Sequence, residues 1–157
     1  NGILVKIFAD LNVDADLQDM SLDSTSVKVH QHGCGAKKGR VVASGRKPSS
    51  DTATHLQLYR TFQDIGAVAH THSTWATVMA QIGRSVPPLG TTHADHFSEA
   101  IPCTRDMSEA EITGDYEANT ALVIAEAFSG SEVNNIPAVL VKNHGPFTWG
   151  ATAAEAV

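Results

Sequence analysis

Apolar positions after residue 48 recur with the spacing of helices and strands, and they predict alternating elements of both kinds. Leu56, Tyr59 and Phe62 lie three residues apart, which predicts a helix over about 50–63. The mostly apolar segment 65–70 that follows is short, as in a buried strand. The two segments together predict a helix that leads into a sheet.

Capping residues indicate where two further helices begin. Ser73 is a suitable N-cap for a helix that Gly83 ends. Ser108 and Glu111 have the spacing of a capping box, in which each residue satisfies a backbone N–H of the other. This box predicts one long helix that ends near Phe128.

Four segments have the apolar character of strands. They are residues 3–8, 41–44, 138–141 and 146–149. Because strands alternate with helices along the chain, we expect a layered α/β architecture in which helices cover a sheet. Five of the 11 Lys and Arg residues lie within 37–47. Such a run is typical of a solvated loop, and a surface that attracts an anion is the alternative.

Composition narrows the class of protein. The 157 residues are 42% apolar and 18% charged, as in a single soluble globular domain. The net charge of −6 argues against a nucleic-acid partner, and no apolar stretch approaches the ~18 residues of a membrane span. Two cysteines, Cys34 and Cys103, are too few for a disulfide framework, so we expect a cytoplasmic location. The ends of the chain lead us to expect a fragment that lacks both termini of a longer polypeptide.

The chain contains eight histidines, a high number for a domain of this size, and histidine is the commonest metal ligand. His70 and His72 leave a predicted strand two residues apart, so their side chains point to the same face and can bind one zinc ion. His144 follows the strand 138–141 as a candidate third ligand, and Gly145 permits a sharp turn there. Taken singly, each motif is more typical of ordinary polar residues at the end of a strand.

Two other segments carry candidate chemistry. Ser49 and Ser50 offer hydroxyls and free N–H groups at a helix start, which is a natural site for a phosphate or an oxyanion. Asp51 is either the cap of that helix or a carboxylate that faces a metal or acts as a base. Asp95, in Thr-Thr-His-Ala-Asp, is either a general acid or base or part of another helix start.

A further cluster of ligand types is a weaker candidate. His30, His32 and Cys34 alternate, but their neighbours are Gly and Lys rather than an apolar strand that would fix their geometry. Gly33 and Gly35 do not continue as a dinucleotide fingerprint, and no Gly-Lys-Ser/Thr of a P-loop follows. This segment is therefore neither a dinucleotide-binding motif nor a P-loop, and a metal site here is the weaker alternative to an ordinary loop.

Five ordered motifs resemble the zinc-dependent class II aldolase/epimerase family from about residue 46 onward. They are Lys47-Pro-Ser-Ser-Asp51-Thr-Ala-Thr-His55, His70-Thr-His72-Ser73, Gly90-Thr-Thr-His-Ala-Asp95, Ile101-Pro-Cys-Thr-Arg105 and Asn143-His144-Gly-Pro-Phe-Thr-Trp-Gly150. The resemblance implies an α/β fold of three layers, α/β/α, with a central mixed, largely antiparallel sheet. Aldolases of the family carry Glu at the position of Asp51. The motifs therefore point to the epimerase branch, which interconverts L-ribulose 5-phosphate and D-xylulose 5-phosphate.

The resemblance implies a single domain over 1–157 with one zinc ion per subunit. His70, His72 and His144 would be the zinc ligands, and Asp51 would lie at or near the metal and contact the substrate. Residues 9–46 match the family poorly. A related class II sugar-phosphate aldolase and a catalytically impaired zinc-binding fragment remain alternatives.

Further roles follow from the same resemblance. Ser49 and Ser50 would bind the phosphate of a small sugar phosphate, and Asp95 would be one of two acid/base groups. The family's second acid/base group is a tyrosine far toward the C-terminus, and neither Tyr59 nor Tyr116 matches its position. The resemblance also implies a cyclic homotetramer with active sites at subunit interfaces.

Overall fold

The computed structural model describes residues 49–128 and 133–157. The strands predicted over 3–8 and 41–44 lie outside these residues, as do the basic run and the cluster of His30, His32 and Cys34. The elements below are those that position the candidate site.

Three strands form an antiparallel sheet in the order β1–β3–β2. β1 spans Ala67–His70, β2 spans Ala138–Leu140 and β3 spans Pro146–Gly150. β3 lies in the centre, and its pairing with β1 places His70 opposite Phe147. All three strands that the sequence predicts in this part of the chain are confirmed.

Helices flank these strands along the chain. They are α2 (Thr52–Thr61), α3 (Thr74–Gln81), α4 (Thr91–Ala94), α5 (Glu109–Thr113), α6 (Tyr116–Ala127) and α7 (Ala153–Ala156). The helix predicted after Ser73 is confirmed as α3, and Gly83 follows it with φ of 64°, a conformation that glycine adopts without strain. Within the part of the chain that the structure describes, no helix is long and apolar enough to cross a membrane.

The prediction of one long helix from Ser108 to Phe128 is wrong. The capping box itself is present, because the Ser108 hydroxyl accepts the Glu111 N–H and the Glu111 carboxylate accepts the Ser108 N–H. The helix nevertheless ends at Gly114, and the Asp115 side chain accepts the Ala118 N–H to begin α6. Glycine is a poor interior helix residue and aspartate is a good N-cap, so the chain starts a second helix here.

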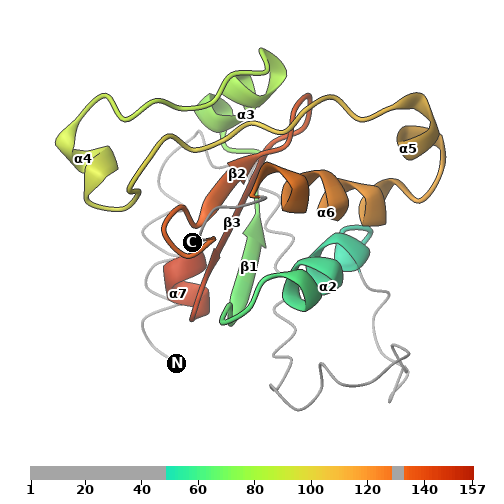
Figure 1. Ribbon diagram of the computed structural model, residues 1–157, viewed down its shortest axis with the longest axis horizontal. Helices are drawn as coiled ribbons and strands as arrows, with labels where there is room; N and C mark the ends of the chain where they lie inside the picture. Colours follow the sequence, from blue (N-terminus) through green and yellow to red (C-terminus); the bar gives the residue numbers. More distant parts are fainter. Residues whose placement is uncertain (1–48, 129–132) are drawn as a thin grey trace, which may run out of the picture.

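Helices cover both faces of the sheet, which confirms the three-layer arrangement. α2 and α6 lie on one side and α7 on the other (Figure 1). Phe147 and Trp149 of β3 face α2 and α6, where their rings are almost fully buried. The residue between them, Thr148, faces the other layer and its hydroxyl donates to the Ala156 carbonyl of α7. The main core therefore lies between the sheet and the pair α2–α6.

The segment 101–105 extends the sheet at the edge of β2. The Thr104 N–H donates to the Leu140 carbonyl at 2.8 Å, and a single parallel bridge joins this segment to β2. Arg105 forms ion pairs with carboxylates of α5 and α6, both at 2.7 Å. The described contacts of this motif therefore hold the helices against the sheet edge.

The core contact between α2 and the sheet can be tested with Leu58→Ala. Leu58 is fully buried, so we expect the free energy of unfolding to fall by about 2–5 kcal/mol in chemical denaturation. Leu89→Ala makes the same change at a residue that is 88% exposed, and it should alter stability by no more than about 0.5 kcal/mol. Equal losses in both variants would show that the described core is wrong.

Candidate metal centre

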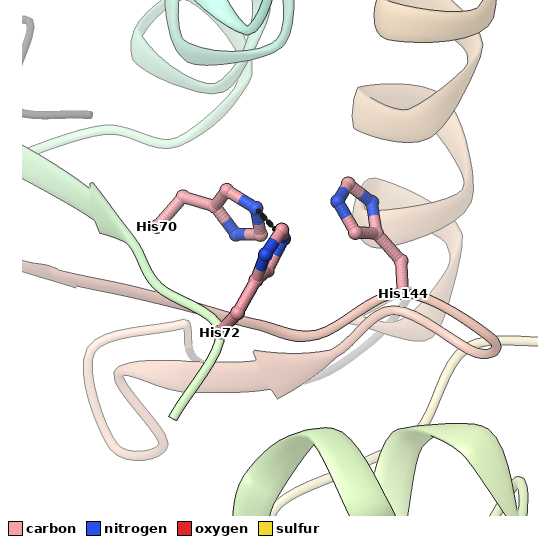
Figure 2. Close-up of side chains that lie close together, drawn as sticks. All are labelled: His70, His72 and His144. Carbon is pink, nitrogen blue, oxygen red and sulfur yellow. Dashed lines mark hydrogen bonds between the residues drawn. The ribbon is translucent and has the colours of Figure 1, made fainter. Parts of the chain in front are cut away.

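Three histidines from two distant segments meet at one end of the sheet. His70 ends β1, His72 lies two residues beyond it, and His144 lies two residues before β3 begins. One ring nitrogen from each histidine lies within 4.8 Å of the others. Figure 2 shows the three rings turned toward a common space. The predicted convergence of these side chains is therefore present in the structure.

The ring of His70 is held from two directions. Its Nδ1 lies 2.8 Å from the carbonyl oxygen of Pro146, and its ring stacks on Phe147 with centroids 4.1 Å apart. Its Nε2 lies 3.1 Å from Nε2 of His72. When Nδ1–H donates to the carbonyl, Nε2 carries the lone pair that a metal needs. The strand pairing therefore both places this ligand and orients it.

Gly145 allows the two segments to approach closely. A Cβ atom at this buried position would lie 3.0 Å from the Thr71 carbonyl oxygen and 3.2 Å from Cδ2 of His72. Asn143 adopts a φ of 64° in the same turn, and its amide donates to the Asp106 carboxylate at 3.1 Å. A larger residue at 145 would push the turn away from the histidines.

Burial favours the neutral, metal-binding form of two imidazoles. The pKa of His70 is lowered to about 4, chiefly by burial and to a smaller extent by the neighbouring imidazoles, while the hydrogen bond to Pro146 opposes the shift. The pKa of His144 is also lowered, chiefly by burial and then by His72, with Asp51 acting in the opposite direction. Protons therefore compete weakly with a metal ion for these nitrogens.

The donor set fits a zinc ion. In a tetrahedral site with Zn–N bonds of about 2.0–2.1 Å, two ligand nitrogens lie about 3.3 Å apart, close to the separation between His70 and His72. Three protein ligands leave a fourth position for water or substrate, as in catalytic zinc sites. The histidines also border a cavity of about 350 Å³ that could admit a small substrate.

The cavity gathers some of the other predicted residues. It is lined by Ser50, Asp51, His70, Thr71, His72, Tyr116, Glu117 and His144. Asp51 occupies the N-cap position of α2 but makes no side-chain capping hydrogen bond. Its carboxylate is therefore available to the cavity, although it does not belong to the tight group of three histidines.

Two predicted residues do not line this cavity. The Ser49 hydroxyl accepts the Asp51 N–H at 3.3 Å, which places it in the turn before α2. Asp95 is exposed at the C-terminal end of α4, and Figure 1 shows α4 well apart from the tip of β1. The phosphate-binding role of Ser49 and the acid/base role of Asp95 therefore stay predictions.

Three residues of the cavity are not among the predicted site residues: Thr71, which lies between two predicted ligands, and Tyr116 and Glu117. Tyr116 and Glu117 begin α6, and the Tyr116 hydroxyl lies 3.3 Å from Nδ1 of His144. The missed signal was Gly114-Asp115, a helix break followed by an N-cap. Recognising it would have placed Tyr116 in the first turn of a new helix.

Comparison with known proteins identifies the class. The chain belongs to the family described as "Class II Aldolase and Adducin N-terminal domain", which matches residues 14–157.

Several solved structures have a similar fold. L-fuculose 1-phosphate aldolase is 29% identical with a TM-score of 0.57, and the match covers 75% of this chain and 50% of that one. YgbL from Escherichia coli, whose description spans aldolase, epimerase and decarboxylase, is 28% identical with a TM-score of 0.53 over 73% and 52% of the two chains. At 21% identity, L-fuculose-1-phosphate aldolase from Thermus thermophilus shows the shared fold alone, with a TM-score of 0.51 over 71% and 51%. The chain spans about half the length of these proteins.

The shifted pKa of His70 predicts a pH dependence of stability in the metal-free protein. An unfolded histidine titrates near pH 6.5, whereas His70 in the fold titrates near pH 4. Between these values the unfolded chain binds a proton that the folded chain does not, so the free energy of unfolding should fall as pH drops from about 6.5 to about 4. Urea denaturation in the presence of a chelator measures this. His70→Gln should flatten the dependence in that window, and an unchanged slope would contradict the assignment.

Proposed function

We propose that the chain provides the zinc-binding part of an enzyme that breaks and remakes a carbon–carbon bond in a sugar phosphate. The gathering of His70, His72 and His144 at the edge of a cavity is the observation that carries the proposal. Membership in the class II aldolase family supports a metal-dependent reaction of this kind.

The proposed reaction is that of L-ribulose-5-phosphate 4-epimerase. C4 of the substrate bears a hydroxyl but is not adjacent to the ketone, so its C–H is not acidic enough for simple proton abstraction. Cleavage of the C3–C4 bond avoids this problem, because the C4 hydroxyl loses its proton as C4 becomes an aldehyde. The products are glycolaldehyde phosphate and the enediolate of the C1–C3 fragment. Rotation of the aldehyde and re-addition then give D-xylulose 5-phosphate.

Each candidate residue has a task in this reaction. A bound zinc ion supplies Lewis acidity to the substrate oxygens, which is worth several kcal/mol of charge stabilisation. Ser49 and Ser50 hold the phosphate so that the aldehyde fragment stays while it rotates, and Asp51 contacts the substrate beside the histidines. Asp95 would accept or donate the proton of the C4 oxygen on one face of the aldehyde; because it does not line the cavity within one chain, this role requires an active site at a subunit interface, as the family resemblance implies.

A related aldolase is the second candidate. The 29% identity to L-fuculose 1-phosphate aldolase favours it, because that protein is an aldolase by name. Against it stands Asp51, where the aldolases that this sequence resembles carry Glu. The two candidates differ in outcome, since an aldolase releases the free aldehyde and an epimerase re-adds it.

The assembly and location of the complete protein are also proposals. The resemblance to the epimerase branch supports a homotetramer, and the low cysteine count supports a cytoplasmic location. The chain spans about half the length of the solved relatives, so the complete protein is the proper subject of activity measurements.

The activity is tested by incubating the full-length parent protein with L-ribulose 5-phosphate and zinc. We expect D-xylulose 5-phosphate without accumulation of glycolaldehyde phosphate, both followed by NMR. Asp95→Asn should retain zinc and lose about 10²-fold or more in rate, as expected for an acid/base group. Free aldehyde in place of the epimer would support the aldolase, and zinc loss in Asp95→Asn would place Asp95 among the ligands.

The ligand assignment is tested separately on the 157-residue chain. His72→Ala removes one of three zinc-binding nitrogens, so zinc content after dialysis should fall well below that of the wild type. His96→Ala is the matched control, because it removes an exposed imidazole that does not line this cavity. Equal zinc content in the two variants would contradict the proposed site.

A further inference from the structure

The hydroxyl of Tyr116 contacts the third candidate zinc ligand. It lies 3.3 Å from Nδ1 of His144, and both residues line the same cavity. Figure 2 shows the His144 ring with one nitrogen directed toward His70 and His72 and the other turned away from them. The contact with Tyr116 therefore uses the nitrogen that the metal does not need.

The start of α6 holds Tyr116 in place. The Thr120 hydroxyl donates to the Tyr116 carbonyl at 2.8 Å, and the Thr54 hydroxyl of α2 donates to the neighbouring Glu117 carbonyl at 2.7 Å. Thr54 and Thr120 are both nearly fully buried, at 1% exposure. The tyrosine is thus fixed by two packed helices rather than by a loop.

The arrangement repeats that of His70. There the Nδ1 atom meets a backbone oxygen, from Pro146, and here Nδ1 of His144 meets the phenol oxygen of Tyr116. In both histidines a protein oxygen lies within hydrogen-bonding distance of Nδ1, and Nε2 points toward the space between the three rings. Outer contacts of this kind fix the tautomer and the ring orientation of metal-binding histidines.

We infer that Tyr116 is the positioning residue of His144: its phenol oxygen accepts the Nδ1–H and so holds the tautomer whose Nε2 can bind zinc. The inference rests on the proposed zinc site. It assigns to Tyr116 a role that acts through His144 and requires no contact with the substrate.

The test compares Tyr116→Phe with the wild type in two measurements. Zinc affinity, from competition with a chromophoric chelator, should weaken by about 10–100-fold. Long-range ¹H–¹⁵N NMR of the metal-free protein should show His144 with its proton on Nδ1 in the wild type and a shift toward Nε2–H in the variant. His144→Gln assigns the resonances. A purely structural role for Tyr116 would not move the tautomer.

Tyr59→Phe is the matched control. The Tyr59 hydroxyl accepts the Val68 N–H at 3.0 Å, away from the cavity, so its loss should lower stability and leave zinc affinity and the His144 tautomer unchanged. If wild type and Tyr116→Phe bind zinc equally and show the same tautomer, the inference is wrong while the zinc site stands. If the wild type binds no zinc, the proposed function itself fails, and the inference fails with it.

Discussion

The pairing of His70 with Phe147 across β1 and β3 is the constraint on which the site depends. It brings the end of one strand beside the start of another, so residues just after β1 and just before β3 share a small volume. The same register sets the ring of His70 on that of Phe147 and its Nδ1 beside the Pro146 carbonyl. A slip of one residue would turn every side chain of β1 to the opposite face and remove His70 from the cavity.

Burial gives this geometry its chemical character. Burial lowers the pKa values of His70 and His144, so both rings are mainly neutral near pH 7 and each carries a nitrogen lone pair. Protonation of these rings is unfavourable also because the imidazoles lie close together. A metal ion held by these histidines would accept the lone pairs of the neutral rings. Two neighbouring residues also fit a metal site here. Gly145 has no side chain that would keep the turn away from the histidines, and Asp51, whose side chain makes no capping hydrogen bond, lines the cavity.

Local patterns in the sequence were sufficient for the three strands within the described residues, for α2 and α3, and for the meeting of the three histidines, because residue spacing at a strand end fixes which face a side chain takes. The same local patterns do not predict the break at Gly114-Asp115, because the capping box and the helix-like apolar spacing both favour a helix that continues through these two residues. The sequence pattern therefore predicts Tyr116 inside one long helix rather than at the cavity. The positions of Ser49 and Asp95 depend on turns and on tertiary packing, which spacing alone does not encode.

We propose above that His70, His72 and His144 form one zinc site in this chain. Metal content per chain, measured on purified protein after loosely bound ions are removed, tests it most directly. We expect about one zinc ion per chain, lost when the histidines are replaced. A folded chain, shown by circular dichroism, that retains no metal after exposure to zinc would contradict it.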